Sequence, residues 1–180
     1  MVKLKITELK KELKAMDQKE LIELISELYK RIPDVQHYLS ARFMGEDAIA
    51  SLYQSAKKKI MDEFFPDRGF GKMRLKEAKN AISNFKKLAN DEMKTIDLMI
   101  YYVEMGTEFT NAYGDIDAKF YNSMVSMYDK ACDECSMDEE KFKPFKDRLC
   151  HIVEESNGIG WGYHDALCEI YFSMGWDEEE

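Results

Sequence analysis

Residues 17–29 read DQKELIELISELY, and this stretch decides the fold class of the chain. Its apolar residues recur at intervals of three and four, the period at which side chains return to one face of an α-helix. Asp17 has the residue type of a helix N-cap, and Glu20 three positions later completes a capping box. The stretch therefore predicts an amphipathic helix with a defined start.

The same period continues on both sides of this stretch. Upstream, Leu9 and Leu13 indicate a short helix with Thr7 as its N-cap, and downstream Pro33 begins a helix that ends at Gly45. Further helices are expected at residues 47–65, 74–89, 93–113 (continuing or bending near Gly106), 116–131, 136–157 (opened by Ser136 and Glu139) and 161–174. Trp161 is expected to close the core.

The expected fold is all-α, with about eight or nine antiparallel helices in stacked helical hairpins that form a bundle or a short superhelix. No alternating strand pattern competes, and only three prolines and nine glycines interrupt the chain. The length fits a single domain over residues 1–180. Residues 177–180 are expected to form a short acidic tail.

Charge is unevenly distributed along the chain. The net charge is −9, yet residues 56–89 contain ten Lys and Arg against four Asp and Glu, whereas residues 90–180 contain seven against twenty-two. This basic segment suggests an anion or partner surface over residues 57–87. Its candidate residues are Lys57, Lys58, Lys59, Arg68, Lys72, Arg74, Lys76 and Lys79. A solvated helix face explains the same pattern.

Two short pairs have the spacing of metal ligands on a helix. Cys132 and Cys135 are three residues apart, and His164 and Cys168 are four apart, so each pair shares a helical face. The four side chains together would suit tetrahedral zinc, although a whole predicted helix separates the pairs. Packing of small apolar cysteines near the core explains the pairs equally simply.

Aromatic residues are unusually dense in the helix expected at residues 93–113. Tyr101, Tyr102, Met105 and Phe109 are too many for one inward stripe. Some of them are therefore expected to line a groove or an interface between copies.

Three stretches resemble an uncharacterised family of small bacterial all-helical proteins, a domain of unknown function. They are DQKELIELISELYKRIPDVQHYL at residues 17–39, FFPDRGFGKMRLKEAKNAISNFKK at residues 64–87 and GWGYHDALCEIY at residues 160–171. The resemblance implies a bacterial, cytosolic, helical protein and brings no catalytic residue with it.

The leading functional expectation is a non-enzymatic helical protein-interaction module, because no catalytic set is assembled in the sequence. Its partner would be a protein, either a second copy or another chain, and no cofactor is expected. One alternative is nucleic-acid or phosphate binding through residues 57–87, and another is an enzyme or metal protein with a dispersed site. Residues 1–14 lack the apolar core of a signal peptide, so a cytoplasmic location without membrane partners is expected.

Overall fold

The computed structural model describes residues 3–175, which contain ten α-helices and no strand. The all-α prediction is therefore confirmed, while the predicted acidic tail at residues 177–180 lies outside the described residues. The helices are α1 (Ile6–Ala15), α2 (Gln18–Arg31), α3 (Pro33–Met44), α4 (Glu46–Phe64), α5 (Leu75–Ala89), α6 (Glu92–Tyr113), α7 (Ala118–Ser136), α8 (Glu139–Phe142), α9 (Lys146–Glu155) and α10 (Tyr163–Ser173). None of these described helices is both long enough and apolar enough to cross a membrane.

The helix starts follow the sequence signals in most places. Asp17 caps α2 and exchanges hydrogen bonds with Glu20 as predicted. The N-cap predicted for α1 was wrong, because α1 begins one residue before Thr7 and its N-cap is Lys5. The backbone N–H of Lys5 donates to Glu8 at 3.1 Å, so the acidic residue of the first turn fixes this start.

The helix predicted over residues 136–157 is divided into α8 and α9. Asp138, not Ser136, caps α8, and a turn at residues 143–145 separates the two helices. Pro144 lies in this turn, and a proline has no N–H with which to continue the hydrogen-bond ladder of a helix. The sequence prediction overlooked this interruption.

Contacts between Cα atoms divide the chain into two compact units, Met1–Ala48 and Ile49–Glu180. Unit 1 holds α1 to α3, and unit 2 holds α5 to α10 with most of α4. The prediction of a single domain over residues 1–180 stays a prediction.

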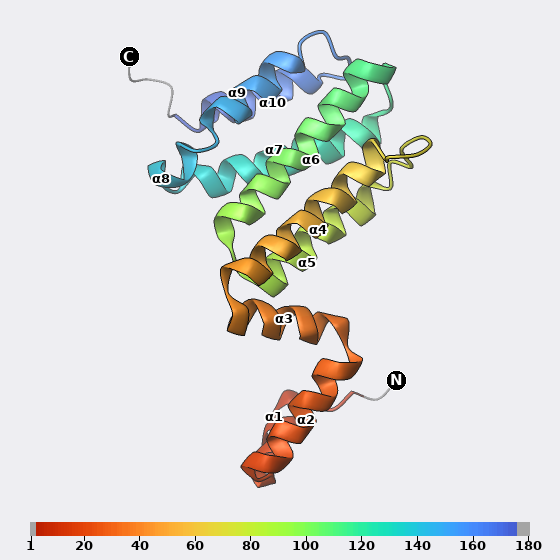
Figure 1. The fold of residues 1–180 in the computed structure, drawn as a ribbon. Helices are drawn as coiled ribbons and strands as arrows, with labels where there is room; N and C mark the ends of the chain where they lie inside the picture. The colour runs from red at the N-terminus through yellow and green to blue at the C-terminus, as the bar shows by residue number, and fades with distance from the viewer. Residues whose placement is uncertain (1–2, 176–180) are drawn as a thin grey trace. The chain divides into compact units, whose positions relative to one another are not determined.

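Unit 2 consists of three helical hairpins, α4 with α5, α6 with α7, and α9 with α10 (Figure 1). The hairpin of α6 and α7 lies in the middle, because α6 contacts α5 and α9 while α7 contacts α10. Asp97, Glu104, Glu108 and Asn111 form a half-buried to exposed stripe on α6, opposite a broad face of buried side chains. The buried side chains belong to Thr95, Ile96, Leu98, Met99, Ile100, Tyr102, Val103, Thr107, Phe109 and Thr110.

The central hairpin depends on a close approach between its two helices. α6 runs without a bend through Gly106, and a Cβ atom at that residue would lie 2.3 Å from Sδ of Met124 on α7. Buried tyrosine hydroxyls link the layers further. Tyr163 bonds Thr107 at 2.8 Å, and Tyr128 donates to the carbonyl of Leu149 at 3.0 Å.

A short loop joins α4 to α5 and is fixed at both ends. The buried carboxylate of Glu63 accepts from the backbone N–H and the Nε of Arg74, each at 3.0 Å, and from its Nη2 at 2.7 Å. The hydrogen bonds from Arg74 hold the pKa of Glu63 below its ordinary value. Gly71 packs on the end of α4, since a Cβ there would lie 2.2 Å from the carbonyl oxygen of Phe64.

Replacing Glu63 by Gln tests this loop. We expect Glu63→Gln to lower the free energy of unfolding by about 1–2 kcal/mol at pH 7, because the charged hydrogen bonds to Arg74 are lost. The pKa of Glu63 is lower in the folded than in the unfolded chain, so its stabilisation is complete above the unfolded value of about 4.3 and is lost as pH falls through the folded value.

Urea unfolding at pH 7 and at a series of lower pH values measures the effect. The difference between the original chain and the variant should shrink on acidification. Glu77→Gln, a change of an exposed glutamate two residues into α5, is the matched control and should leave stability nearly unchanged. A difference that stays constant down to acid pH would contradict this account.

Candidate functional site

The apolar side chains of unit 1 are mostly exposed. Among its described residues only Ala41 is buried. Of the sixteen exposed large apolar side chains in the described chain, eleven lie in unit 1 and five in the much longer unit 2. The eleven are Leu4, Ile6, Leu9, Ile22, Ile25, Leu28, Tyr29, Ile32, Tyr38, Phe43 and Met44. Exposed apolar surface is therefore concentrated in α1 to α3.

A groove lies between α2 and α3, and we call it the α2–α3 groove. Its lining residues are Ile25, Ser26, Tyr29, Lys30, Leu39, Ser40, Phe43 and Met44, around a volume of about 460 Å³. Phe43 and Met44, two of these lining residues, are 78% and 67% exposed. A concave, mainly apolar surface with a few polar groups is typical of a binding site.

Local sequence explains how the groove forms. Ile32 is at once the C-cap of α2 and the N-cap of α3, and Pro33 supplies the first residue of α3. The two helices therefore meet at a sharp corner (Figure 1). Along α2, Ile22 extends the line of Ile25 and Tyr29, and the three residues follow the i, i+3, i+7 spacing of one helical stripe.

A charged network joins three helices of unit 2. Arg148 on α9 binds both carboxylate oxygens of Glu104 on α6 at 2.7 Å. It also binds Asp97, which lies two turns earlier on the same stripe of α6. Tyr53 on α4 donates to Asp97, and its burial together with this bond raises the pKa of the tyrosine hydroxyl. Both carboxylates are thus satisfied from within the unit, which favours a structural role.

The proposed metal ligands come together only in part. Cys132 and Cys135 are buried in α7, and burial raises the pKa of the Cys135 thiol to about 11. His164 and Cys168 do meet, with Nε2 and Sγ 3.5 Å apart. In residues 3–175 no three His, Cys, Asp or Glu side chains are grouped closely enough to hold a metal ion.

The ring of His164 is held in a fixed orientation. Its Nδ1 lies 3.1 Å from the carbonyl oxygen of Val153 and 2.9 Å from the hydroxyl of Ser156. The carbonyl can only accept, so Nδ1 carries a proton and donates to it. The structure therefore brings the second predicted pair together as a hydrogen-bonded pair within α10.

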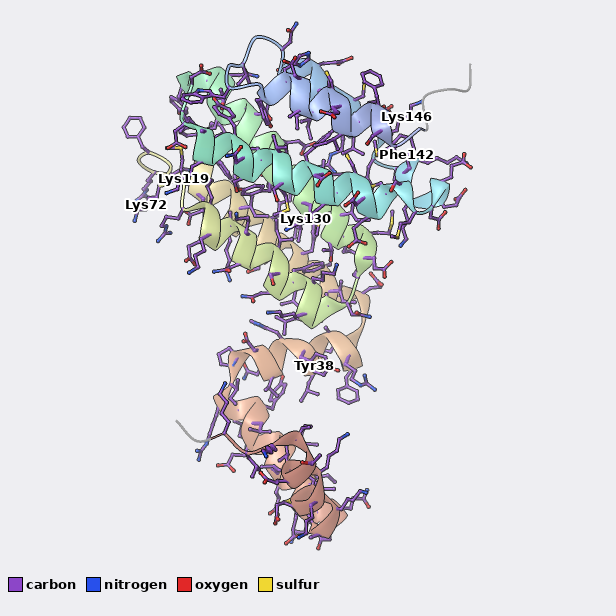
Figure 2. The ribbon with its side chains drawn as sticks, turned by 180° about the vertical axis from the view of Figure 1, so that it is seen from behind. Tyr38, Lys72, Lys119, Lys130, Phe142 and Lys146 are labelled. Atoms are coloured by element: carbon purple, nitrogen blue, oxygen red, sulfur yellow. The ribbon has the colours of Figure 1, made fainter. Side chains whose placement is uncertain are left out.

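Half of the basic candidates have their own partners. Lys58 pairs with Asp62 and Asp67, Lys79 contacts Ser123, and Arg74 is bound by Glu63. The amine of Lys57 lies 4.5 Å from the ring centre of Tyr101. The remaining candidates are Lys59, Arg68, Lys72 and Lys76, all exposed, with Lys72 in the loop before α5 (Figure 2).

Of the four residues of α6 predicted in part to line a groove, Met105 lines a pocket of about 400 Å³ between α6 and α9. Tyr102 is fully buried and Phe109 nearly so, while Tyr101 and Met105 are half-buried. Trp161 is 61% exposed in the turn before α10, so the prediction that it closes the core was wrong. Its backbone lies in the left-handed region at φ 63°, which directs the side chain away from the packed helices.

Comparison with known proteins gives one match. The model of a family of unknown function, DUF6155, matches residues 4–173. The chain belongs to this family. No curated protein and no solved structure matches this DUF6155 protein. The resemblance to a domain of unknown function is therefore confirmed, and the bacterial origin that it implies stays an expectation.

The exposed apolar surface of unit 1 in this DUF6155 protein was not predicted from the sequence. Periodicity located the apolar stripe of α2 but does not report whether another element covers it. The charged network could not be predicted from local sequence either. It consists of Tyr53, Asp97, Glu104 and Arg148, and its partners on different helices are 44 or 51 residues apart. The seven-residue spacing of Asp97 and Glu104 was the one available hint.

Arg148→Met tests the charged network. We expect a loss of about 2 kcal/mol in the free energy of unfolding, because two partly buried carboxylates lose their common cation. Arg31→Met removes an arginine from an exposed pair with Glu27 on α2 and should cost less than about 0.5 kcal/mol. Equal effects of the two substitutions in urea unfolding would refute the structural role of Arg148.

Thiol reactivity tests the placement of the cysteines. In the native protein at pH 8, Cys150 and Cys168 should react readily with a disulfide reagent, because both are partly exposed. Cys132 and Cys135 should react only on unfolding, because burial raises the pKa of each thiol. Cys168→Ser should remove one fast-reacting thiol, and fast reaction of all four in the native state would contradict the buried positions.

Proposed function

We propose that this DUF6155 protein is a helical protein-interaction module whose α2–α3 groove binds the apolar face of an amphipathic helix. The observation that carries the proposal is the exposure of apolar side chains in unit 1, where only Ala41 is buried among the described residues. Helices with apolar faces gain stability in water when another surface covers those faces.

The amount of uncovered surface supports a partner. Eleven large apolar side chains in unit 1 are 38–78% exposed. Aromatic side chains present roughly 150–250 Å² each and aliphatic ones less, so the eleven leave somewhat less than about 1,000 Å² uncovered as a total distributed over α1 to α3. The largest apolar patch of an ordinary monomer covers about 300–600 Å². A standard interface buries about 800 Å² on each partner.

The shape of the groove supports a helix as the occupant. Ile25 and Tyr29 lie on one wall, and Leu39 and Phe43 on the other, four residues apart in each case. Side chains at positions i and i+4 of a partner helix have the matching spacing. Lys30, Ser26 and Ser40 provide the polar groups that would fix the direction of the bound helix.

Nucleic-acid binding has less support. Two of the eight basic candidates, Lys58 and Arg74, already pair with carboxylates, and only four are without a polar or aromatic contact. We also infer a cytoplasmic setting, because the four cysteines are free thiols and a reducing compartment preserves that state.

A photo-crosslinking amino acid at position 43 tests the proposal in living cells. Position 70 is the matched control, because Phe70 is 86% exposed but lies in the loop before α5, outside unit 1. We expect a discrete protein adduct from position 43, and little from position 70. Ile25→Glu in the same chain should abolish the adduct by placing a charge in the groove. Equal adducts from both positions, or none from position 43, would rule the proposal out.

A further inference from the structure

We infer that the occupant of the α2–α3 groove is a second copy of this chain, so that the two N-terminal units form a symmetric pair. This inference rests on the proposed function and names its partner. Three features of unit 1 lead to it: its charge balance, its combination of a groove with exposed apolar side chains, and the stripe along α2.

Charge favours contact between copies at unit 1. Residues 1–48 contain nine Lys and Arg and nine Asp and Glu, so this unit has no formal net charge. The net charge of −9 therefore belongs entirely to residues 49–180. Two copies repel one another through their second units, and the neutral unit is where they meet at the lowest electrostatic cost.

Unit 1 also carries both halves of a self-complementary contact. In a two-fold symmetric interface, the same patch of both copies is in contact. That patch must therefore contain both the groove and the side chains that fill it. Phe43 and Met44 line the α2–α3 groove and are also 78% and 67% exposed, so these two side chains form part of the recess and are open to contact from the other copy. A partner of different shape would need only one of these features.

The stripe on α2 adds a third argument. Ile22, Ile25 and Tyr29 are 56%, 49% and 41% exposed and lie on one face of α2 with the i, i+3, i+7 spacing of a heptad. Such a stripe packs on a stripe of the same kind, with the side chains of one helix between those of the other.

Sedimentation equilibrium of the purified full chain over a wide concentration range tests the inference. We expect a mass twice the 21.1 kDa of the chain at high concentration and reversible dissociation on dilution. Ile25→Glu and Phe43→Glu should each raise the dimer dissociation constant by about tenfold or more. Both side chains are exposed, so neither substitution removes a core contact. Phe70→Glu should leave the dissociation constant unchanged.

Two outcomes overturn the inference. One is a chain that stays monomeric at every concentration, and the other is a dimer that Ile25→Glu and Phe43→Glu leave intact. The crosslink from position 43 separates this failure from that of the proposed function. An adduct with a different protein, abolished by Ile25→Glu, would retain the groove as a protein-binding site and exclude the second copy. An adduct of two identical chains would support both.

Discussion

Because α6 buries a broad face of side chains, opposite the polar stripe of Asp97, Glu104, Glu108 and Asn111, unit 2 needs neighbours on several sides of that helix. The hairpins of α4 with α5 and of α9 with α10 meet this need, and α7 covers the remaining side. Gly106 lets α6 and α7 approach closely, and the hydroxyls of Tyr102, Tyr128 and Tyr163 all have partners within the core. Arg148 then joins α9 to α6 through two carboxylates. The order of layers in unit 2 thus follows from the burial of a single helix.

Unit 1 shows the opposite balance between apolar residues and burial. Its helices α1 and α2 are as clearly amphipathic as those of unit 2, yet the three short helices enclose too little volume for a core of their own. Apolar helix faces of the kind that form the core of unit 2 are therefore left exposed in unit 1. In physical terms the candidate site is the part of the hydrophobic pattern that the packing of α1 to α3 leaves open.

Sequence reasoning recovered the helices well because capping and periodicity are local properties. Asp17 with Glu20, and Gly45 at the end of α3, act as the sequence predicts. It failed where one residue overrides a periodic pattern, as Pro144 does between α8 and α9. Of the four residues of α6 from which some were expected to line a groove or an interface, Met105 lines a pocket, whereas Tyr102 and Phe109 are buried because α6 lies in the middle of unit 2. The site itself was out of reach, because exposure depends on which elements pack together and not on the spacing of residues along α2.

The attachment of the loop before α5 has a consequence for how this chain can change over evolution. The carboxylate of Glu63 accepts three hydrogen bonds from Arg74, and Gly71 packs against the carbonyl of Phe64 at the end of α4. The number of residues between Glu63 and Arg74 is therefore constrained. Inserted residues would move the guanidinium away from the carboxylate. Deletions would stretch the loop or place a residue with a side chain at the position of Gly71, against that carbonyl. Insertions and deletions among relatives should therefore avoid this connection, although Phe70 at its tip is free to vary in chemical character.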